Sequence, residues 1–257
     1  MILTVNIGNT HLTVAAYRAG ALLFSGKLSA APATSDEYAI RLIHLLTLHH
    51  SAPGHIEGVM LASVVPALTG RVVAALRMLT SARIMTVGPG LKSGLKLRLD
   101  QPAQLGAELL CGVVAAMAEG PAPMAVIFSD TALTIMGVNA QKELVGGVIL
   151  PGPQLSMTSL VQNTAQLPQV DLTAPAPASV LGKNTAACLQ GGLLLGTACM
   201  LDGLADRFRA ELGPETRFYA TGNLPANLRK ACRTSILYRE DLVTDGLYRI
   251  WLRNRKA

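Results

Sequence analysis

A meander of short strand-like runs that occurs twice is the feature that most constrains this 257-residue chain. The first meander covers Ile2 to Leu28 and turns at Gly8-Asn9 and at Ala19-Gly20. The second covers Met124 to Leu150 and turns at Asn139 to Lys142. Each is followed by helical patterns, so the chain is expected to be an α/β protein built from two similar halves, with duplication as the simplest origin.

Gly120 to Pro123 is the best candidate for the boundary between these halves, which gives an N-terminal half at 1–120 and a C-terminal half at 121–257. In both halves, turns rich in Gly, Asn and Thr lie between the first strands. This arrangement favours a nucleotide cleft between the halves. The main helices are expected at Tyr38–His49, Leu105–Met117, Pro153–Leu160, Thr185–Leu212, Ala226–Cys232 and Thr244–Asn254.

The modest excess of positive charge raises two kinds of partner, an acidic ligand and a nucleic acid. Half of the residues are hydrophobic and 15% are charged, and Lys plus Arg exceed Asp plus Glu by 22 to 16. The local concentration of cations at Arg249 to Lys256 is typical of a solvated last helical turn. It lacks the alternating aromatic residues that stack bases, so nucleic-acid binding is the least supported hypothesis.

A cytoplasmic location is the expectation from three features. The chain opens on a strand-like run without a basic segment before an apolar core. The most apolar stretch, Leu189 to Leu201, is broken by glycines and falls short of the ~18 residues that span a bilayer. Four widely spaced cysteines without a CxxC pair suggest buried free thiols in a reducing compartment.

Short motifs follow one another along nearly the whole chain, starting with Asn6-Ile7-Gly8-Asn9-Thr10. Further ones are Ser63-Val64-Val65-Pro66, Val87-Gly88-Pro89-Gly90, Gly146-Gly147-Val148-Ile149-Leu150-Pro151-Gly152, Gly182-Lys183-Asn184-Thr185 and Ala220-Thr221-Gly222. Each alone could be ordinary turn chemistry. In this order and spacing they resemble the type III pantothenate kinases.

The resemblance implies two RNase H-like halves of the actin and sugar-kinase superfamily, each a strand meander plus helices, with a cleft between them. It also implies phosphorylation of pantothenate in coenzyme A biosynthesis, with ATP, Mg²⁺ and a monovalent cation. A homodimer is implied as well. Gly192 and Gly196, four residues apart, would let a partner helix approach closely, although packing within the chain explains them equally well.

The first turn expected to bind phosphate resembles that of the family, except that the family's acidic residue is replaced. Gly8, Asn9 and Thr10 retain the small, hydrogen-bonding turn on which such kinases seat phosphate. Asn6 stands where the family has Asp. A neutral amide removes the charge that favours a hard divalent cation.

The second phosphate turn departs further from the family. Thr131 to Thr134 resembles a Gly-Thr-Ala-Thr-Thr turn, which places Phe128 on an acidic position and Asp130 on a glycine. Thr131 and Thr134 are therefore expected to contact nucleotide. Asp130 is either an ordinary turn residue or, in a shifted register, a metal ligand that replaces the lost acid.

The adenosine and acceptor sites are expected at four further places in the chain. Thr221 and Gly222 resemble the element that borders adenosine. Gly106-Ala107-Glu108-Leu109 resembles Gly-Ala-Asp-Arg, which supplies the base and an arginine for the acceptor's carboxylate. Leu99 replaces an aromatic residue of the acceptor pocket, and Thr185 is the third expected contact with the acceptor.

Glu108 is consequently the candidate base, one methylene longer than Asp, or else a solvated carboxylate favoured at a helix start. Leu109 cannot pair with a carboxylate. Two hypotheses follow. One is a pseudokinase that binds a nucleotide or an acidic metabolite and acts through partner contacts. The other is a working phosphotransferase that uses Glu108 on pantothenate or a related hydroxyl acceptor.

Overall fold

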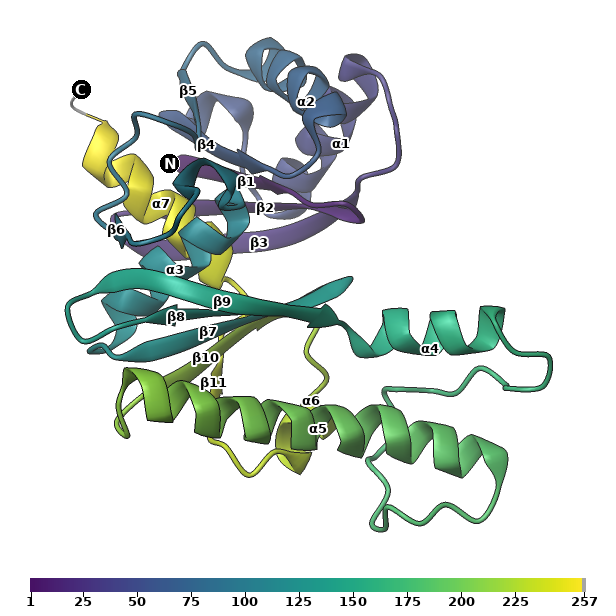
Figure 1. Cartoon of the computed structure of the whole chain (residues 1–257). Coiled ribbons are helices and arrows are strands. Elements are labelled where there is room, and N and C mark those ends of the chain that lie inside the picture. Colours follow the sequence, from purple (N-terminus) through teal and green to yellow (C-terminus); the bar gives the residue numbers. More distant parts are fainter. Residues whose placement is uncertain (256–257) are drawn as a thin grey trace. The chain divides into compact units, whose positions relative to one another are not determined.

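The computed structural model describes residues 1–255, so Lys256 of the basic tail and Ala257 lie outside the described residues. The contacts group into two compact units. Unit 1 comprises Met1–Gly94, Gln101–Ala118 and the C-terminal segment from Asp241, and unit 2 comprises Leu95–Asp100 and Glu119–Glu240. Figure 1 shows the elements of both units. The expected halves at 1–120 and 121–257 stay a prediction, because grouping by contacts does not test where the duplicated units begin.

Unit 1 contains a five-stranded sheet with the order β3-β2-β1-β4-β5. Its strands are β1 (Ile2–Ile7), β2 (His11–Arg18), β3 (Ala21–Ser29), β4 (Gly58–Ser63) and β5 (Arg83–Thr86). The first three form the expected antiparallel meander, and β4 pairs with β1 in parallel, so that Asn6 lies beside Ala62. The carboxyl ends of β1 and β4 therefore meet at the same sheet edge.

The helices of unit 1 begin at residues that suit helix starts. They are α1 (Ser35–Leu48), α2 (Pro66–Leu79), α3 (Ala107–Glu119) and α7 (Leu242–Asn254), with single 3₁₀ turns at Pro53–His55 and Pro102–Gln104. Thr34 and Glu37 form a capping box at the start of α1. Pro66 starts α2, where its missing N–H costs nothing.

The two faces of the unit 1 sheet are buried by different helices. Leu3, Val5 and Ile7 share a core with the apolar faces of α1 and α2. On the other face, Tyr17 of β2 stacks on Tyr248 of α7, with 4.8 Å between ring centroids. Alternation along the strands thus decides which helix each residue meets.

Two glycines let α7 pack closely within unit 1. A Cβ at Gly58 would overlap the ring of Trp251, and one at Gly246 would overlap the Cys111 backbone in α3. Side chains at these two positions would push α7 away from β4 or from α3. Glycines therefore let α7 pack closely against both β4 and α3.

Unit 2 repeats the strand order of unit 1 in its own sheet, with the order β11-β10-β7-β8-β9-β6. The strands are β6 (Lys96–Leu97), β7 (Met124–Ser129), β8 (Ala132–Val138), β9 (Glu143–Pro151), β10 (Arg217–Gly222) and β11 (Ile236–Tyr238). Here β7, β8 and β9 form the antiparallel meander, and β10 pairs with β7 in parallel. The prediction of an α/β fold with two similar halves is confirmed.

One face of the unit 2 sheet is covered by α4 (Pro153–Gln162), α5 (Thr185–Leu212) and α6 (Ala226–Ala231). Ile127, Ile135 and Phe218 share a core with Leu194 and Leu201 of α5. Figure 1 shows α4 and the first half of α5 extending beyond the sheet of this unit. The buried residues of α5 nevertheless run from Leu189 to Ala205, so both halves of the helix contribute to the core.

The expectation that the apolar stretch of α5 is too short for a bilayer was wrong. The helix has 28 residues, and an 18-residue window within it has a mean hydropathy of 1.3, enough by length and composition alone to span a membrane. The glycines counted as interruptions do not end the helix. Because 44% of that window is buried inside the protein, the apolar residues are also explained by the core of unit 2.

The expectation that the cysteines are buried thiols holds only in part. All four are free, but Cys111 alone among them is buried, while Cys188 and Cys199 are exposed and Cys232 is half-buried. The apolar neighbours of Cys188 and Cys199 in the sequence lie on the other face of α5. Helical periodicity, rather than local composition, decides their exposure.

A buried carboxylate anchors the start of β11 to α5. Asp202, with 4% of its surface exposed, accepts hydrogen bonds from the backbone N–H groups of Arg233, at 2.9 Å, and Thr234, at 2.8 Å. Burial raises its pKa, but these hydrogen bonds outweigh burial and lower the pKa below its usual value. Asp202 thus satisfies two N–H groups as an ionised side chain.

Replacing this carboxylate should destabilise the protein. Asp202→Ala leaves two N–H groups without their acceptor, and we expect it to lower the free energy of unfolding by about 2 kcal/mol or more. Urea denaturation measures the change. The matched control is Asp206→Ala, one turn along α5, whose side chain is 66% exposed in an ion pair with Arg209 and should change stability by less than about 0.5 kcal/mol. Equal effects of the two changes would contradict this role.

The same variant should have a defined pH dependence. Because the folded pKa of Asp202 is lowered, its stabilisation is fully present above the unfolded carboxyl pKa of about 3.9 and is lost as pH falls through the folded value. The difference in stability between wild type and Asp202→Ala should therefore shrink on acidification below about pH 4. A difference that stays constant or grows there would show that the carboxylate charge is not what stabilises the loop.

Candidate functional site

The β1–β2 turn of unit 1 brings the first set of expected site residues together. Gly8 donates its N–H to the His11 carbonyl at 2.9 Å, and a Cβ at Gly8 would lie 3.2 Å from that oxygen. Asn9 and Thr10 follow as exposed residues at the tip. The turn therefore presents an amide and a hydroxyl side chain to solvent at the carboxyl end of β1.

Asn6 lies at the same strand end with an unsatisfied polar atom. The residue is 7% exposed, and within residues 1–255 its Oδ1 is buried without a hydrogen-bond partner. A buried carbonyl-type oxygen without a donor is costly, and such an atom is explained by a ligand, a water or an ion that supplies the missing contact. The Asn6 Oδ1 is therefore available to contact a ligand, a water or an ion.

The second set of residues meets where β7 and β10 end in unit 2. Gly222 lies beside Ser129 in the parallel ladder, and a Cβ at Gly222 would lie 3.0 Å from the Ser129 carbonyl carbon. Its φ of 84° also favours glycine. Asn223 donates its N–H to the Ser129 carbonyl at 2.5 Å. Two turns thus touch through their backbones.

Side chains also join the turns that follow β7 and β10. The Asn223 amide donates to Asp130 Oδ1 at 3.3 Å, and exposed Thr131 follows in the same turn. Thr221 is buried and donates its hydroxyl to the Glu240 carbonyl at 3.2 Å. Asp130, Thr131, Thr221 and Gly222 therefore occupy one edge of one sheet.

Thr134 lies in β8 rather than at that edge. It is buried and lies directly opposite Phe128, which in turn lies beside Thr221 in the ladder. Phe128 is itself buried, at 5% exposed. The position at which the resemblance led us to expect an acid is therefore filled by an apolar ring in the interior of unit 2.

Sequence reasoning missed two groups beside Gly222. The Tyr238 hydroxyl donates to the Gly222 carbonyl at 2.7 Å, and the Arg229 guanidinium lies 4.0 Å from the centre of the Tyr238 ring. Nothing in the local sequence marks either residue. The pairing of β11 with β10 brings Tyr238 to the sheet edge that holds Gly222. A three-residue strand is too short for its sequence to predict this parallel register.

The candidate base lies in unit 1, in the first turn of α3. Glu108 is half-buried there, and the Gly106 carbonyl accepts the N–H of Leu110 at 3.1 Å, so Gly106 precedes the helix as its cap. Burial is the main reason that the pKa of the Cys111 thiol lies well above its usual value, and the nearby Glu108 charge raises this pKa further. Leu109 presents no polar group at this helix start.

Two expected acceptor-site residues lie on other elements of unit 2. Leu99 follows β6 and is half-buried. Thr185 is the exposed first residue of α5, next to the cap Asn184, whose side chain accepts the N–H of Ala187 at 2.8 Å. The structure does not join these two to the edge formed by β7 and β10. The cleft expected between the halves stays a prediction.

The residues present fit a polyphosphate better than a protein-held metal cluster. Gly222 and Gly152 allow backbones to approach closely, since a Cβ at Gly152 would lie 2.7 Å from the Thr131 carbonyl oxygen. Among residues 1–255, no group of three His, Cys, Asp or Glu side chains is placed to hold a metal ion. Mg²⁺ commonly takes one or two carboxylates plus substrate phosphates, and Asp130 is a carboxylate at this turn.

The strand order of the two sheets, with a polar turn at each strand end, defines an α/β fold of the actin and sugar-kinase type. Each unit pairs an antiparallel meander with a parallel fourth strand and places a polar turn at the carboxyl edge, where open α/β sheets bind ligands. Residues 2–207 match the sequence model of the type III pantothenate kinases. The chain belongs to this family.

Relatives named type III pantothenate kinase match along the full length. The protein from Dehalococcoides mccartyi strain BAV1 is 32% identical, with 99% of this chain and 96% of that protein covered. The one from Myxococcus xanthus is 32% identical, and both chains are covered in full.

Solved structures agree on the fold. A conserved putative Baf family transcriptional activator from Campylobacter jejuni has a TM-score of 0.60 at 16% identity, with 99% of this chain and 100% of that chain covered. A putative 2-dehydro-3-deoxygalactonokinase from Sinorhizobium meliloti has a TM-score of 0.58 at 13% identity, covering 97% and 95%. At these identities the likeness concerns the fold.

Proposed function

We propose that this chain is an ATP-dependent phosphotransferase that phosphorylates pantothenate or a related hydroxyl acceptor in coenzyme A biosynthesis, with Glu108 as the general base. The observation that carries the proposal is a half-buried carboxylate in the first turn of α3, directly after Gly106-Ala107, in a chain that belongs to the family. A half-buried carboxylate can take a proton from a hydroxyl when it lies within hydrogen-bond reach.

The two strand-end turns would bind the nucleotide. Asn9 and Thr10 offer exposed donors for phosphate oxygens, and Thr131 offers a hydroxyl in the second turn. Gly222 keeps its turn free of a side chain, so adenosine could lie against the backbone. When bound, Mg²⁺ would neutralise phosphate charge. Asp130 is the candidate carboxylate for its waters, and a monovalent cation is part of the same proposal.

The acceptor site would be less selective for a carboxylate than in the relatives. Leu109 and Leu99 offer apolar contacts where the family uses an arginine and an aromatic residue, while Gly106 and Thr185 are retained. Without a charge-assisted contact, the acceptor's carboxylate would gain little from this site. We therefore expect a raised KM for pantothenate.

A second candidate is a pseudokinase that binds nucleotide or an acidic metabolite without turnover. The buried ring of Phe128 and the neutral Asn6 favour it, because neither supplies the negative charge that holds a divalent cation at a phosphate. Its function would then lie in partner contacts. The two candidates differ in a single measurable quantity, the formation of phosphorylated product.

Glu108→Gln should reduce product formation by at least about 100-fold, since an amide cannot accept the proton. The measurement is mass-spectrometric detection of 4′-phosphopantothenate from purified protein, ATP, Mg²⁺, a monovalent salt and pantothenate, beside an active family member. The matched control is Glu215→Gln, an exposed residue in the turn between α5 and β10, which should leave the rate unchanged. Product from wild type and Glu108→Gln at equal rates would exclude Glu108 as the base, and no product from wild type would favour the pseudokinase.

Restoring the missing acids should act in the opposite direction. Asn6→Asp places a carboxylate at the end of β1 without changing side-chain size, and we expect it to raise the Mg²⁺-dependent rate about tenfold, with Asn6→Asp and Phe128→Asp together raising it further. Circular dichroism of both variants checks that they fold. A folded Asn6→Asp variant with an unchanged rate would show that the absent acid is not the limiting defect.

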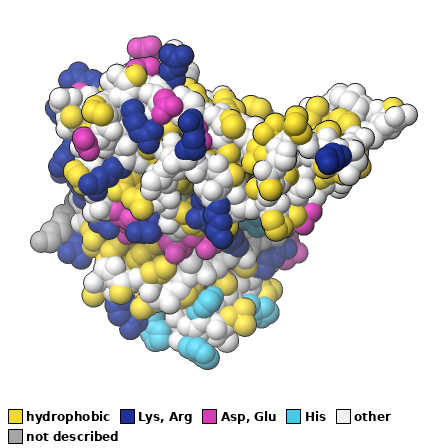
Figure 2. All heavy atoms as spheres, turned by 90° about the horizontal axis from the view of Figure 1, so that it is seen from below, with side chains coloured by type: hydrophobic (Ala, Val, Ile, Leu, Met, Phe, Trp, Pro, Cys, Tyr) yellow, Lys and Arg dark blue, Asp and Glu magenta, His cyan; other side chains and the backbone are white. Residues whose placement is uncertain are grey.

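A cytoplasmic homodimer is part of the proposal, and unit 2 offers a surface for it. Gly192 and Gly196 are open, with no atom within 4 Å of a Cβ at either position. Val180 and Leu181 nearby in the sequence are 75% and 80% exposed. Figure 2 shows hydrophobic side chains gathered over this extended part of the α4–α5 segment. A second copy would cover apolar area that otherwise faces water.

Gly196→Glu should then weaken the dimer. A charged side chain at a close helix contact adds bulk and an unpaired charge, so we expect a shift to monomer in light scattering coupled to size-exclusion chromatography. Gly203→Glu is the matched control, since Gly203 is equally open but lies further along α5, where the helix covers the sheet. A dimer that persists in both variants, or a monomeric wild type, would reject this interface.

A further inference from the structure

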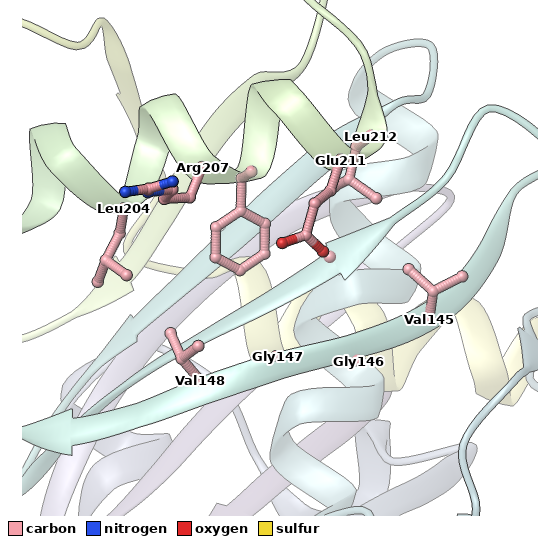
Figure 3. A pocket seen from close by; sticks show the side chains of 10 residues that line it. Val145, Gly146, Gly147, Val148, Leu204, Arg207, Glu211 and Leu212 are labelled. Atoms are coloured by element: carbon pink, nitrogen blue, oxygen red, sulfur yellow. The ribbon is translucent and has the colours of Figure 1, made fainter.

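A cavity of ≈ 170 Å³ lies in unit 2 between α5 and the β8–β9 hairpin, apart from every residue assigned above to phosphotransfer. The strands contribute Gly137 of β8 and Val145 to Val148 of β9, and the helix contributes its last two turns (Figure 3). Val148, Leu204 and Phe208 give the wall apolar side chains, and Arg207 and Glu211 give it charges.

Glycines create this cavity. Gly137 and Gly146 lie opposite each other in the ladder, next to a bulge that leaves Val145 as the extra residue. A Cβ at Gly137 would lie 3.0 Å from the Phe208 ring, and Gly146 has a φ of 150°, which L side chains rarely adopt. The strands therefore present bare backbone to the helix, and no side chain fills the space.

Two opposite charges stand at the cavity wall. Arg207 and Glu211 are one turn apart on α5, about 6 Å along its axis at 1.5 Å per residue. Within the described part of the chain, neither makes an ion pair or a side-chain hydrogen bond. An Arg placed before a Glu at this spacing is the weaker orientation for a helical pair. Figure 3 shows the Glu211 carboxylate directed towards the strand of Gly146 and Gly147, with Arg207 one turn away.

We propose that this cavity binds a small zwitterion of the α-amino-acid class with an apolar side chain. The ligand's carboxylate would pair with Arg207 and its ammonium group with Glu211, while the side chain would lie against Val148, Leu204 and the glycine backbone. The size agrees, because ≈ 170 Å³ corresponds to roughly six waters at about 30 Å³ each and admits a ligand of roughly ten non-hydrogen atoms or fewer.

The pairing of charges selects this class over simpler ligands. A fatty acid or another apolar anion would leave Glu211 beside its apolar tail, and an apolar amine would do the same to Arg207. Only a ligand that carries both charges close together satisfies both side chains at once. Both are exposed, so each contact is screened by water and the dissociation constant should lie in the millimolar range.

The test uses L-leucine as the probe and the full-length protein, followed by saturation-transfer NMR and by amide shifts of unit 2. We expect saturable binding, with shifts at Gly146 and Gly147. The matched ligands 4-methylpentanoate and 3-methylbutylamine, which lack the ammonium and the carboxylate respectively, should bind at least about tenfold more weakly, in line with charge-assisted contacts.

Variants complete the test. Arg207→Gln and Glu211→Gln should each weaken leucine binding several-fold, whereas Glu215→Gln, an exposed carboxylate outside the cavity, should leave it unchanged. The proposal is overturned if leucine shows no saturable binding at millimolar concentrations, or if only one of the two charge variants weakens it. Equal binding of leucine and 4-methylpentanoate would also overturn it. No outcome depends on phosphotransfer, so failure here leaves the proposed function untouched.

Discussion

The close approach of backbones at the ends of paired parallel strands is the constraint on which the candidate site depends. Gly222 lies against Ser129 with room only for a hydrogen atom, and Asn223 then donates its N–H to the same residue. Because the parallel register of β10 on β7 brings both turns to one edge, the polar side chains of both turns follow. In unit 1 the Gly8 turn connects β1 to β2, and the parallel pairing of β4 with β1 brings the end of β4 beside it.

Most of the elements could be predicted because their patterns are local. The two meanders predicted at Ile2 to Leu28 and Met124 to Leu150 end within one residue of β1 to β3 and β7 to β9, and the 28-residue span of α5 matched its predicted bounds. What a sequence pattern does not contain is the partner of each element. The α7 pattern predicts a helix, but only the fit of Trp251 on Gly58 and of Gly246 on Cys111 decides that it covers the unit 1 sheet. The two-residue strand β6 is too short for any periodicity.

In the candidate site, too, local features could be predicted from the sequence, whereas those that depend on how elements pair could not. Motifs located the turn at Gly8 to Thr10 and the one at Asp130 and Thr131, because Gly, Asn and Thr carry turn chemistry that is readable in sequence. Tyr238 had no such signal, since its place beside Gly222 arises from the pairing of β11 with β10, and Arg229 of α6 lies over the Tyr238 ring. The cavity at Gly146 was equally invisible, because an empty space depends on side chains that are absent from two strands at once.

Asn6 relates the stability of the protein to its proposed chemistry. A carboxylate buried at this position would be costly without a cation, whereas the amide that stands there leaves only one unsatisfied oxygen. The chain thus keeps a strand end that is stable without metal and still has a buried, unpaired acceptor for an ion or water that binds there. Asn6 lowers the energetic penalty of the state without metal and, because it is neutral, it also weakens the binding of a divalent cation.

Phe128 has the same two effects in unit 2. Its buried ring adds apolar contacts to the core, and its position in the strand pairing carries no negative charge. Under the proposed function, Asn6 and Phe128 would therefore make the empty protein more stable and its phosphotransfer slower.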